Sequence, residues 1–298
     1  MLLNKRIPVS YIFNKVKTDL FFVILVGLTV HYFTTVFANV LPEMPLTIPA
    51  FLGTAISILL SFKMSQSYDR WWEARKVWGA IVNDSRSFVI QLQSFIHSEN
   101  ERSAIRQMAF RQIACCYSLG QSLRGLDPIE NTTQYLSEDD LTELEKHNNK
   151  PLGLLHLNAS QIRSLKQKNE IDIHTQVQLD NTLTRLCDSI GKAERIKNTI
   201  FPTTYRLFLH LTIYLFVIIL SISLKNIDTY FEIPLLVTIS SVFFLVEKSA
   251  THLQDPFSNR PSDTSVTAIA RTIEINIKQL LGEQEIPKPI QPETFYVL

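Results

Sequence analysis

Residues 67–86 read SYDRWWEARKVWGAIVNDSR and follow closely on an apolar run, Met44–Phe62, that carries no formal charge. The three tryptophans of the chain all lie in this stretch, among charged residues of both signs. Tryptophan is costly to expose and charge is costly to bury, so the stretch needs a place that offers both environments. It predicts a helix that leaves a membrane and continues into polar surroundings.

Two interpretations fit the tryptophans. At helical spacing Trp71, Arg75, Trp78 and Val82 share one face, which favours a helix packed among other helices at a subunit interface. An aromatic belt with snorkelling arginines is the alternative. The belt explains Trp71 and Trp72 but not Trp78, which lies further from the end of the apolar run. We therefore expect a packed interface.

Four apolar runs divide the chain: Leu20–Val40, Met44–Phe62, Leu207–Leu224 and Ile233–Val246. A hydrocarbon layer of about 30 Å takes about 20 helical residues to cross, so the first three qualify and the fourth is close. The first run is too long for a signal peptide and no clear cleavage site follows it, so we interpret it as a retained span. The predicted fold class is all-α, with four transmembrane helices.

Lysine and arginine concentrate before the first run, after the second and at the cytoplasm-facing ends of the last two. By the positive-inside rule both termini and the long middle section are expected in the cytoplasm. The predicted regions are an N-terminal segment with a transmembrane hairpin, 1–62 (helices about 20–40 and 44–62), a cytoplasmic helical region, 63–204, a second hairpin, 205–246, and a cytoplasmic C-terminal segment with an extended tail, 247–298.

The cytoplasmic region reads as helical. Ser137 followed by three acidic residues resembles a capping box. Between Asp172 and Asn198 apolar residues recur at roughly helical spacing, and Gly120–Thr133 is expected to be a loop.

Composition excludes several classes of protein. A net charge of +1 and a pI near 7.7 give no reason to expect nucleic-acid binding. No nucleotide-binding loop, metalloprotease motif or hydrolase motif appears, so we expect neither an enzyme nor a cofactor. Cys115, Cys116 and Cys187 fall in the reducing compartment without metal-ligand spacing, so no metal site is expected.

The tryptophan-rich stretch closely resembles the signature of bacterial bestrophin homologues. The matching residues are Arg70, Trp71, Trp72, Trp78, Asn83 and Asp84. GKAERIKNTIFP (191–202) and the stretch 253–282, with Asp255, Pro256 and Phe257, resemble the family too. The resemblance implies an ion channel in a bacterial cytoplasmic membrane, a homopentamer in contact with lipid whose second helix lines the pore.

The family's hydrophobic neck maps by this resemblance onto Thr54, Ile58 and Phe62, where Thr54 replaces a more usual apolar residue. A ring of such apolar side chains holds water poorly and gates by dewetting. Ordinary lipid-facing residues give the same stripe, and only the resemblance favours the neck. The cytoplasmic aperture maps onto Ile173, with Ile171 as the second choice.

Calcium gating is not expected. In eukaryotic members a run of acidic residues follows the Asp-Pro-Phe motif, whereas here Ser258-Asn259-Arg260-Pro261-Ser262 intervene before Asp263. One carboxylate beside an arginine is a poor calcium site.

Charges near the outer ends of the spans bear on ion selectivity. Glu43, Asp228 and Glu232 would concentrate cations if they ring the pore mouth, and would do nothing if they are scattered. His31, His210 and His174 are further candidates for a role in permeation. We expect monovalent cations (Na⁺ or K⁺), with Cl⁻ a close second. The alternative is a membrane-anchored sensor or scaffold whose cytoplasmic helices bind a partner protein.

Overall fold

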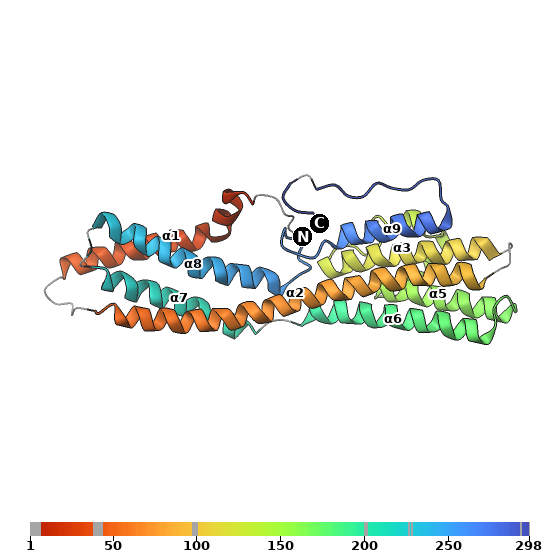
Figure 1. Ribbon diagram of the computed structural model, residues 1–298, viewed down its shortest axis with the longest axis horizontal. Coiled ribbons are helices and arrows are strands. Elements are labelled where there is room, and N and C mark those ends of the chain that lie inside the picture. Colours follow the sequence, from red (N-terminus) through yellow and green to blue (C-terminus); the bar gives the residue numbers. More distant parts are fainter. Residues whose placement is uncertain are drawn as a thin grey trace. The chain divides into compact units, whose positions relative to one another are not determined.

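The computed structural model describes residues 7–37, 44–96, 101–199, 202–225, 227, 229–292 and 294–297. The elements in these residues are helices, as the sequence predicts (Figure 1). They are α1 (Val9–Val36), α2 (Thr47–Phe95), α3 (Arg102–Arg124), the short 3₁₀ helix η2 (Thr133–Tyr135), α4 (Glu138–Glu145), α5 (Lys150–Gln167), α6 (Ile173–Asn198), α7 (Thr203–Ser223), α8 (Thr229–Gln254) and α9 (Val266–Leu281).

The chain divides into two compact units. The first, here called the membrane unit, comprises Lys5–Arg70 and Ile200–Gln254, and the second, the polar unit, comprises chiefly Trp71–Thr199 and Asp255–Leu298. The division falls inside α2, which supplies its first part to the membrane unit and its second part to the polar unit.

In the membrane unit, α1 packs against α7 and α8, and α7 against α8. The core is aliphatic and aromatic, and includes Val23, Ile56, Ile213 and Phe244, each fully buried. Four helices, α1, α2, α7 and α8, are long and apolar enough to cross a membrane. The predicted set of four apolar helices is therefore confirmed, although α1 begins at Val9, well before the apolar run that starts at Leu20.

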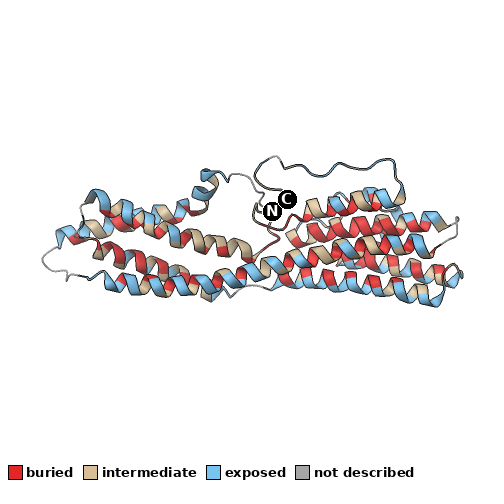
Figure 2. Cartoon of the chain, in the orientation of Figure 1, coloured by how far each residue is buried: buried red, intermediate tan, exposed pale blue. Residues whose placement is uncertain are grey.

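Much apolar surface of these helices stays uncovered within the chain (Figure 2). Only 28% of the most apolar window of α1, and 33% of that of α7, is buried. A soluble protein rarely exposes apolar side chains on this scale, whereas lipid or a neighbouring subunit covers them at no cost.

In the polar unit, α3 packs against α5 and α9, and α5 packs against α6. The core contains Trp78 and Phe88 from α2, Met108 and Ile113 from α3, and Leu186 from α6. Along α2 the buried positions Ala74, Trp78, Ile81, Phe88 and Leu92 follow one another at three-, four- or seven-residue spacing, so local periodicity already selects the buried face.

Side-chain caps fix several helix starts. The Ser137 side chain accepts from the Asp140 amide and the Asp140 carboxylate accepts from the Ser137 amide, which confirms the predicted capping box of α4. Asp172 caps α6 by accepting from the Thr175 amide, so the helix expected up to Asn198 is confirmed.

The loop predicted for Gly120–Thr133 is wrong in its first residues. Helix α3 continues through Gly120 and ends at Arg124, with Gly125 in the left-handed conformation at φ 72°. Gly120 is buried inside this helix, and a Cβ there would meet the Val266 side chain of α9 at 3.5 Å, which is an ordinary van der Waals distance.

Candidate functional site

The predicted neck residues lie on the face of α2 that α1, α7 and α8 leave uncovered. Ile58 is 54% exposed and Phe62 62% exposed, while Ile56 and Leu60 on the opposite face are buried. Thr54 is exposed too, and its hydroxyl donates to the Ala50 carbonyl oxygen at 2.9 Å. The face therefore presents three side chains at one-turn spacing to the surroundings of the chain.

This hydrogen bond reduces the capacity of the Thr54 hydroxyl to bind water. Its proton is used inside the helix, so only the oxygen lone pairs remain for water. The Thr54 side chain is therefore less hydrophilic here than a threonine whose hydroxyl proton is free.

The family-motif residues have several different environments. Trp78 is fully buried in the core of the polar unit, so its predicted place at a subunit interface is wrong. The physical reason is that Trp78 belongs to a buried apolar cluster to which α3, α6 and α9 of the same chain contribute. Trp72 is 46% exposed and Arg70 half-buried, whereas the Trp71 indole N–H donates to the Ser262 carbonyl oxygen at 3.0 Å.

Two motif positions lie near the surface of the polar unit. Asp84 accepts from the Arg185 Nε at 2.9 Å, which links α2 to α6, and Asn83 is exposed. Trp71 and Asp84 thus act in this chain as ties between elements.

The Asp255-Pro256-Phe257 segment forms a closed turn between α8 and α9. Phe257 is buried, and the Thr264 amide donates to the Pro256 carbonyl oxygen at 3.0 Å. Burial raises the pKa of the Asp255 carboxyl, but the Ser258 hydroxyl and the Lys197 ammonium outweigh it and leave that pKa below its usual value. Asp263 is buried and accepts from the Arg260 amide at 3.0 Å. Both carboxylates are engaged by groups of the protein itself.

The two aperture candidates have opposite environments. Ile173 is the first residue of α6 and is 55% exposed, whereas Ile171 is 5% exposed and belongs to the core of the polar unit. Of the two, Ile173 has the surface to face an opening. His174 beside it is exposed as well.

Of the three expected pore-mouth carboxylates, Glu43 and Asp228 lie outside the described residues. Glu232 is buried, and its Oε2 lies 2.8 Å from the Nδ1 of His31 on α1. A carboxylate in this position ties α8 to α1 and does not present a free charge to an aqueous mouth.

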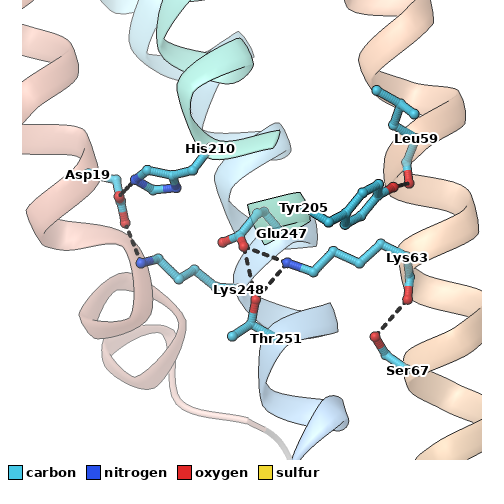
Figure 3. A network of polar contacts seen from close by, with 9 residues as sticks. All are labelled: Asp19, Leu59, Lys63, Ser67, Tyr205, His210, Glu247, Lys248 and Thr251. Atoms are coloured by element: carbon cyan, nitrogen blue, oxygen red, sulfur yellow. Dashed lines mark hydrogen bonds and ion pairs between the residues drawn. The ribbon is translucent and has the colours of Figure 1, made fainter. Parts of the chain in front are cut away.

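A polar network that sequence reasoning did not identify crosses the membrane unit (Figure 3). The buried Lys63 Nζ donates to the Glu247 Oε1 at 2.6 Å and to the Thr251 hydroxyl at 2.8 Å. The Asp19 Oδ2 pairs with the Lys248 Nζ at 3.2 Å, and its Oδ1 lies 3.6 Å from the His210 Nε2. The sequence contained a signal for the Lys63–Glu247 pair, because each of the two residues directly follows an apolar run and they carry opposite charges.

The ion pair of Lys63 and Glu247 lies beside the predicted neck residues. Lys63 follows Phe62 on α2, and the Tyr205 hydroxyl donates to the Leu59 carbonyl oxygen at 3.1 Å one turn earlier (Figure 3). Helices α7 and α8 therefore hold α2 from the side opposite to the exposed stripe, which fixes the direction in which Ile58 and Phe62 point.

Comparisons with known proteins agree on one family. A family model described as Bacterial/Fungal Bestrophin protein matches residues 5–279. The "Voltage-dependent anion channel-forming protein YneE" of Escherichia coli O157:H7 is 31% identical over 248 residues, which cover 83% of this chain and 80% of that protein. The "Voltage-dependent anion channel-forming protein RSc3414" of Ralstonia nicotianae is 26% identical over 235 residues, covering 79% and 77%.

Solved structures give the same result. The crystal structure of a bacterial bestrophin homologue from Klebsiella pneumoniae superimposes with a TM-score of 0.84 at 28% sequence identity. The match covers 91% of this chain and the whole of that one.

Proposed function

This chain belongs to the bacterial and fungal bestrophin family, and we propose that it forms a passive channel for small monovalent ions in the bacterial cytoplasmic membrane. The observation that carries the proposal is the uncovered stripe of Thr54, Ile58 and Phe62 on α2. The names of the curated relatives, which describe channel-forming proteins, support it.

The pore of this proposal lies between copies of the chain. The stripe points away from the helices of its own membrane unit, so a path lined by α2 needs several copies around a common axis. We propose a homopentamer, from the family resemblance, with lipid around its outer helices. Both termini and residues 63–204 and 247–298 then lie on the cytoplasmic side, as the distribution of lysine and arginine predicts.

The proposed gate is a dry neck. Rings of Ile58 and Phe62 offer an ion no substitute for its hydration shell, so an empty neck sheds water and blocks current. Thr54 lies one turn further out. Ile173 supplies the second constriction, at the cytoplasmic aperture.

The charge sign of the conducted ion has two candidates. The sequence resemblance favours monovalent cations, although the buried Glu232 removes one of the three carboxylates expected to attract them. The names of the curated relatives, which describe anion channels, favour anions. Along the exposed face of α2 from Thr54 to Phe62 no side chain carries charge, so selectivity depends on groups beyond the neck.

Reconstitution in a planar bilayer under a salt gradient tests the proposal. A reversal potential near the cation equilibrium potential selects cations, and one near the chloride potential selects anions. We expect Ile58→Ala and Phe62→Ala to raise the current by widening and wetting the neck. Leu25→Ala, at an exposed position of α1, should leave it unchanged.

Absence of current from the wild type and from both neck variants would refute the channel. The sensor or scaffold alternative, in which the cytoplasmic helices bind a partner protein, would then take its place.

A further inference from the structure

We propose that the membrane unit binds the phosphate of an anionic phospholipid in a cavity between the first turns of α7 and the last turns of α8. The cavity has a volume of about 500 Å³. It is lined by Thr203, Thr204, Arg206, Leu207, His210, Glu247, Lys248 and Thr251. All of these residues belong to the membrane unit.

Charge around the cavity is unbalanced towards positive. The Glu247 carboxylate is neutralised by the buried Lys63, and Lys248 pairs with Asp19 at 3.2 Å (Figure 3). Within the part of the chain that the structure describes, the Arg206 side chain has no ion pair or hydrogen bond. One guanidinium is thus left over at the rim of the cavity.

The donors available suit phosphate. A guanidinium presents parallel N–H groups that match two oxygens of a phosphate, and this geometry favours arginine at phosphate sites. An ammonium has three protons, so Lys248 can hold Asp19 and still donate to a second acceptor. The exposed hydroxyls of Thr203 and Thr204 add neutral donors at the same turn of α7.

The position of the cavity selects a lipid as the source of that phosphate. The apolar run of α7 begins at Leu207 and that of α8 ends at Val246, so the cavity lies where the hydrocarbon layer meets the headgroups. Leu207, itself a lining residue, starts a stripe with Leu211 and Leu215 in which every side chain is half or more exposed. An acyl chain can follow this stripe while its headgroup stays in the cavity.

The leaflet follows from the proposed orientation. If both termini are cytoplasmic, the cavity faces the inner leaflet, where basic pockets between membrane helices attract anionic headgroups. Binding there would join the ends of α7 and α8 and add to the stability of the membrane unit.

Thermal unfolding of the detergent-solubilised full-length protein tests the inference, with native mass spectrometry to count bound lipids. The probes are short-chain phosphatidylglycerol, short-chain phosphatidylcholine and inorganic phosphate. We expect phosphatidylglycerol to raise the melting temperature more than phosphatidylcholine does. Arg206→Gln should weaken phosphatidylglycerol binding roughly fivefold, as the loss of one interfacial basic side chain predicts. Arg163→Gln, an equal change at an exposed position of the polar unit, should bind like the wild type.

Each outcome decides one point. Equal effects of the two lipids, or an Arg206→Gln variant that binds phosphatidylglycerol like the wild type, would overturn the site. If inorganic phosphate raises the melting temperature as much as phosphatidylglycerol does, and the rise depends on Arg206, the assignment of a lipid would be overturned and free phosphate would be the ligand. Neither measurement needs an ion current, so the result is independent of whether the channel proposal holds.

Discussion

Replacement of Lys63 by methionine tests how the membrane unit is held together. The Lys63 side chain is 0% exposed and that of Glu247 3% exposed, and their charged atoms lie 2.6 Å apart. Methionine has nearly the same length but no charge. It therefore leaves the Glu247 carboxylate buried with the Thr251 hydroxyl, at 2.9 Å, as its remaining partner among the groups seen in the structure.

The expected cost is large because the Glu247 side chain, which keeps its charge, is only 3% exposed. Removing one partner of a buried ion pair costs about 3–5 kcal/mol. For a chain of this size each kcal/mol lowers the melting temperature by about 2 °C, so Lys63→Met should melt roughly 6–10 °C below the wild type. Lys63→Met with Glu247→Leu removes both charges, and we expect it to recover most of this loss, since replacing a whole buried pair by apolar residues is often neutral.

The assay is thermal unfolding in detergent, followed by near-ultraviolet circular dichroism. Lys146→Met is the matched control, because Lys146 pairs with Glu143 on the exposed surface of α4 and should show no measurable shift. A Lys63→Met variant that melts with the wild type would refute the reasoning. So would a double variant whose loss equals the sum of the two single losses, because the pair would then have no coupling energy.

Acid titration, glycine substitution and calcium addition test three other features of the structure. Burial raises the pKa of the Asp140 carboxyl, but the hydrogen bonds and charge of Arg111 outweigh this effect and keep that pKa below its usual value. The ionised carboxylate therefore stabilises the fold above about pH 4, and this contribution is lost as the pH falls further. Asp140→Asn should therefore melt below the wild type at neutral pH, with a gap that narrows below pH 4; a constant gap would contradict this. Gly153→Ala should lower the free energy of unfolding by about 1–3 kcal/mol, since the new Cβ would lie 2.9 Å from the Leu144 side chain and 3.1 Å from the His147 ring. Gly191→Ala, with open space around it in α6, should be neutral or stabilising. Equal melting temperatures of the two variants would count against the packing argument. Micromolar Ca²⁺ should leave the current unchanged, because Asp255 is held by Ser258 and Lys197, and a steep calcium dependence in bilayer recordings would show that the turn opens to bind the ion.

Local properties of the sequence determined much of this protein. Runs such as Leu207–Leu224 lack charge over a length that suits a membrane helix, and a run of that kind needs no tertiary information to be recognised. Ser137 and Asp172 begin their helices with hydrogen bonds to amides three residues away, so their roles are encoded within one helical turn. The family resemblance and helical spacing placed Thr54, Ile58 and Phe62 on one face of α2, and the structure shows that this face is exposed within the chain. Its role as a pore neck stays a prediction until current is measured.

Tertiary structure alone decided which partners the charged and aromatic residues have. Lys63 meets Glu247 across 184 positions of sequence and His31 meets Glu232 across 201, and no local pattern couples residues so far apart. Trp78 has the spacing of an interface residue but is buried in a core that also contains residues of α3, α6 and α9 of the same chain. Hydrophobicity and periodicity report which side of a helix avoids water, whereas what covers that side depends on how distant segments pack, and a single helix carries no record of its neighbours.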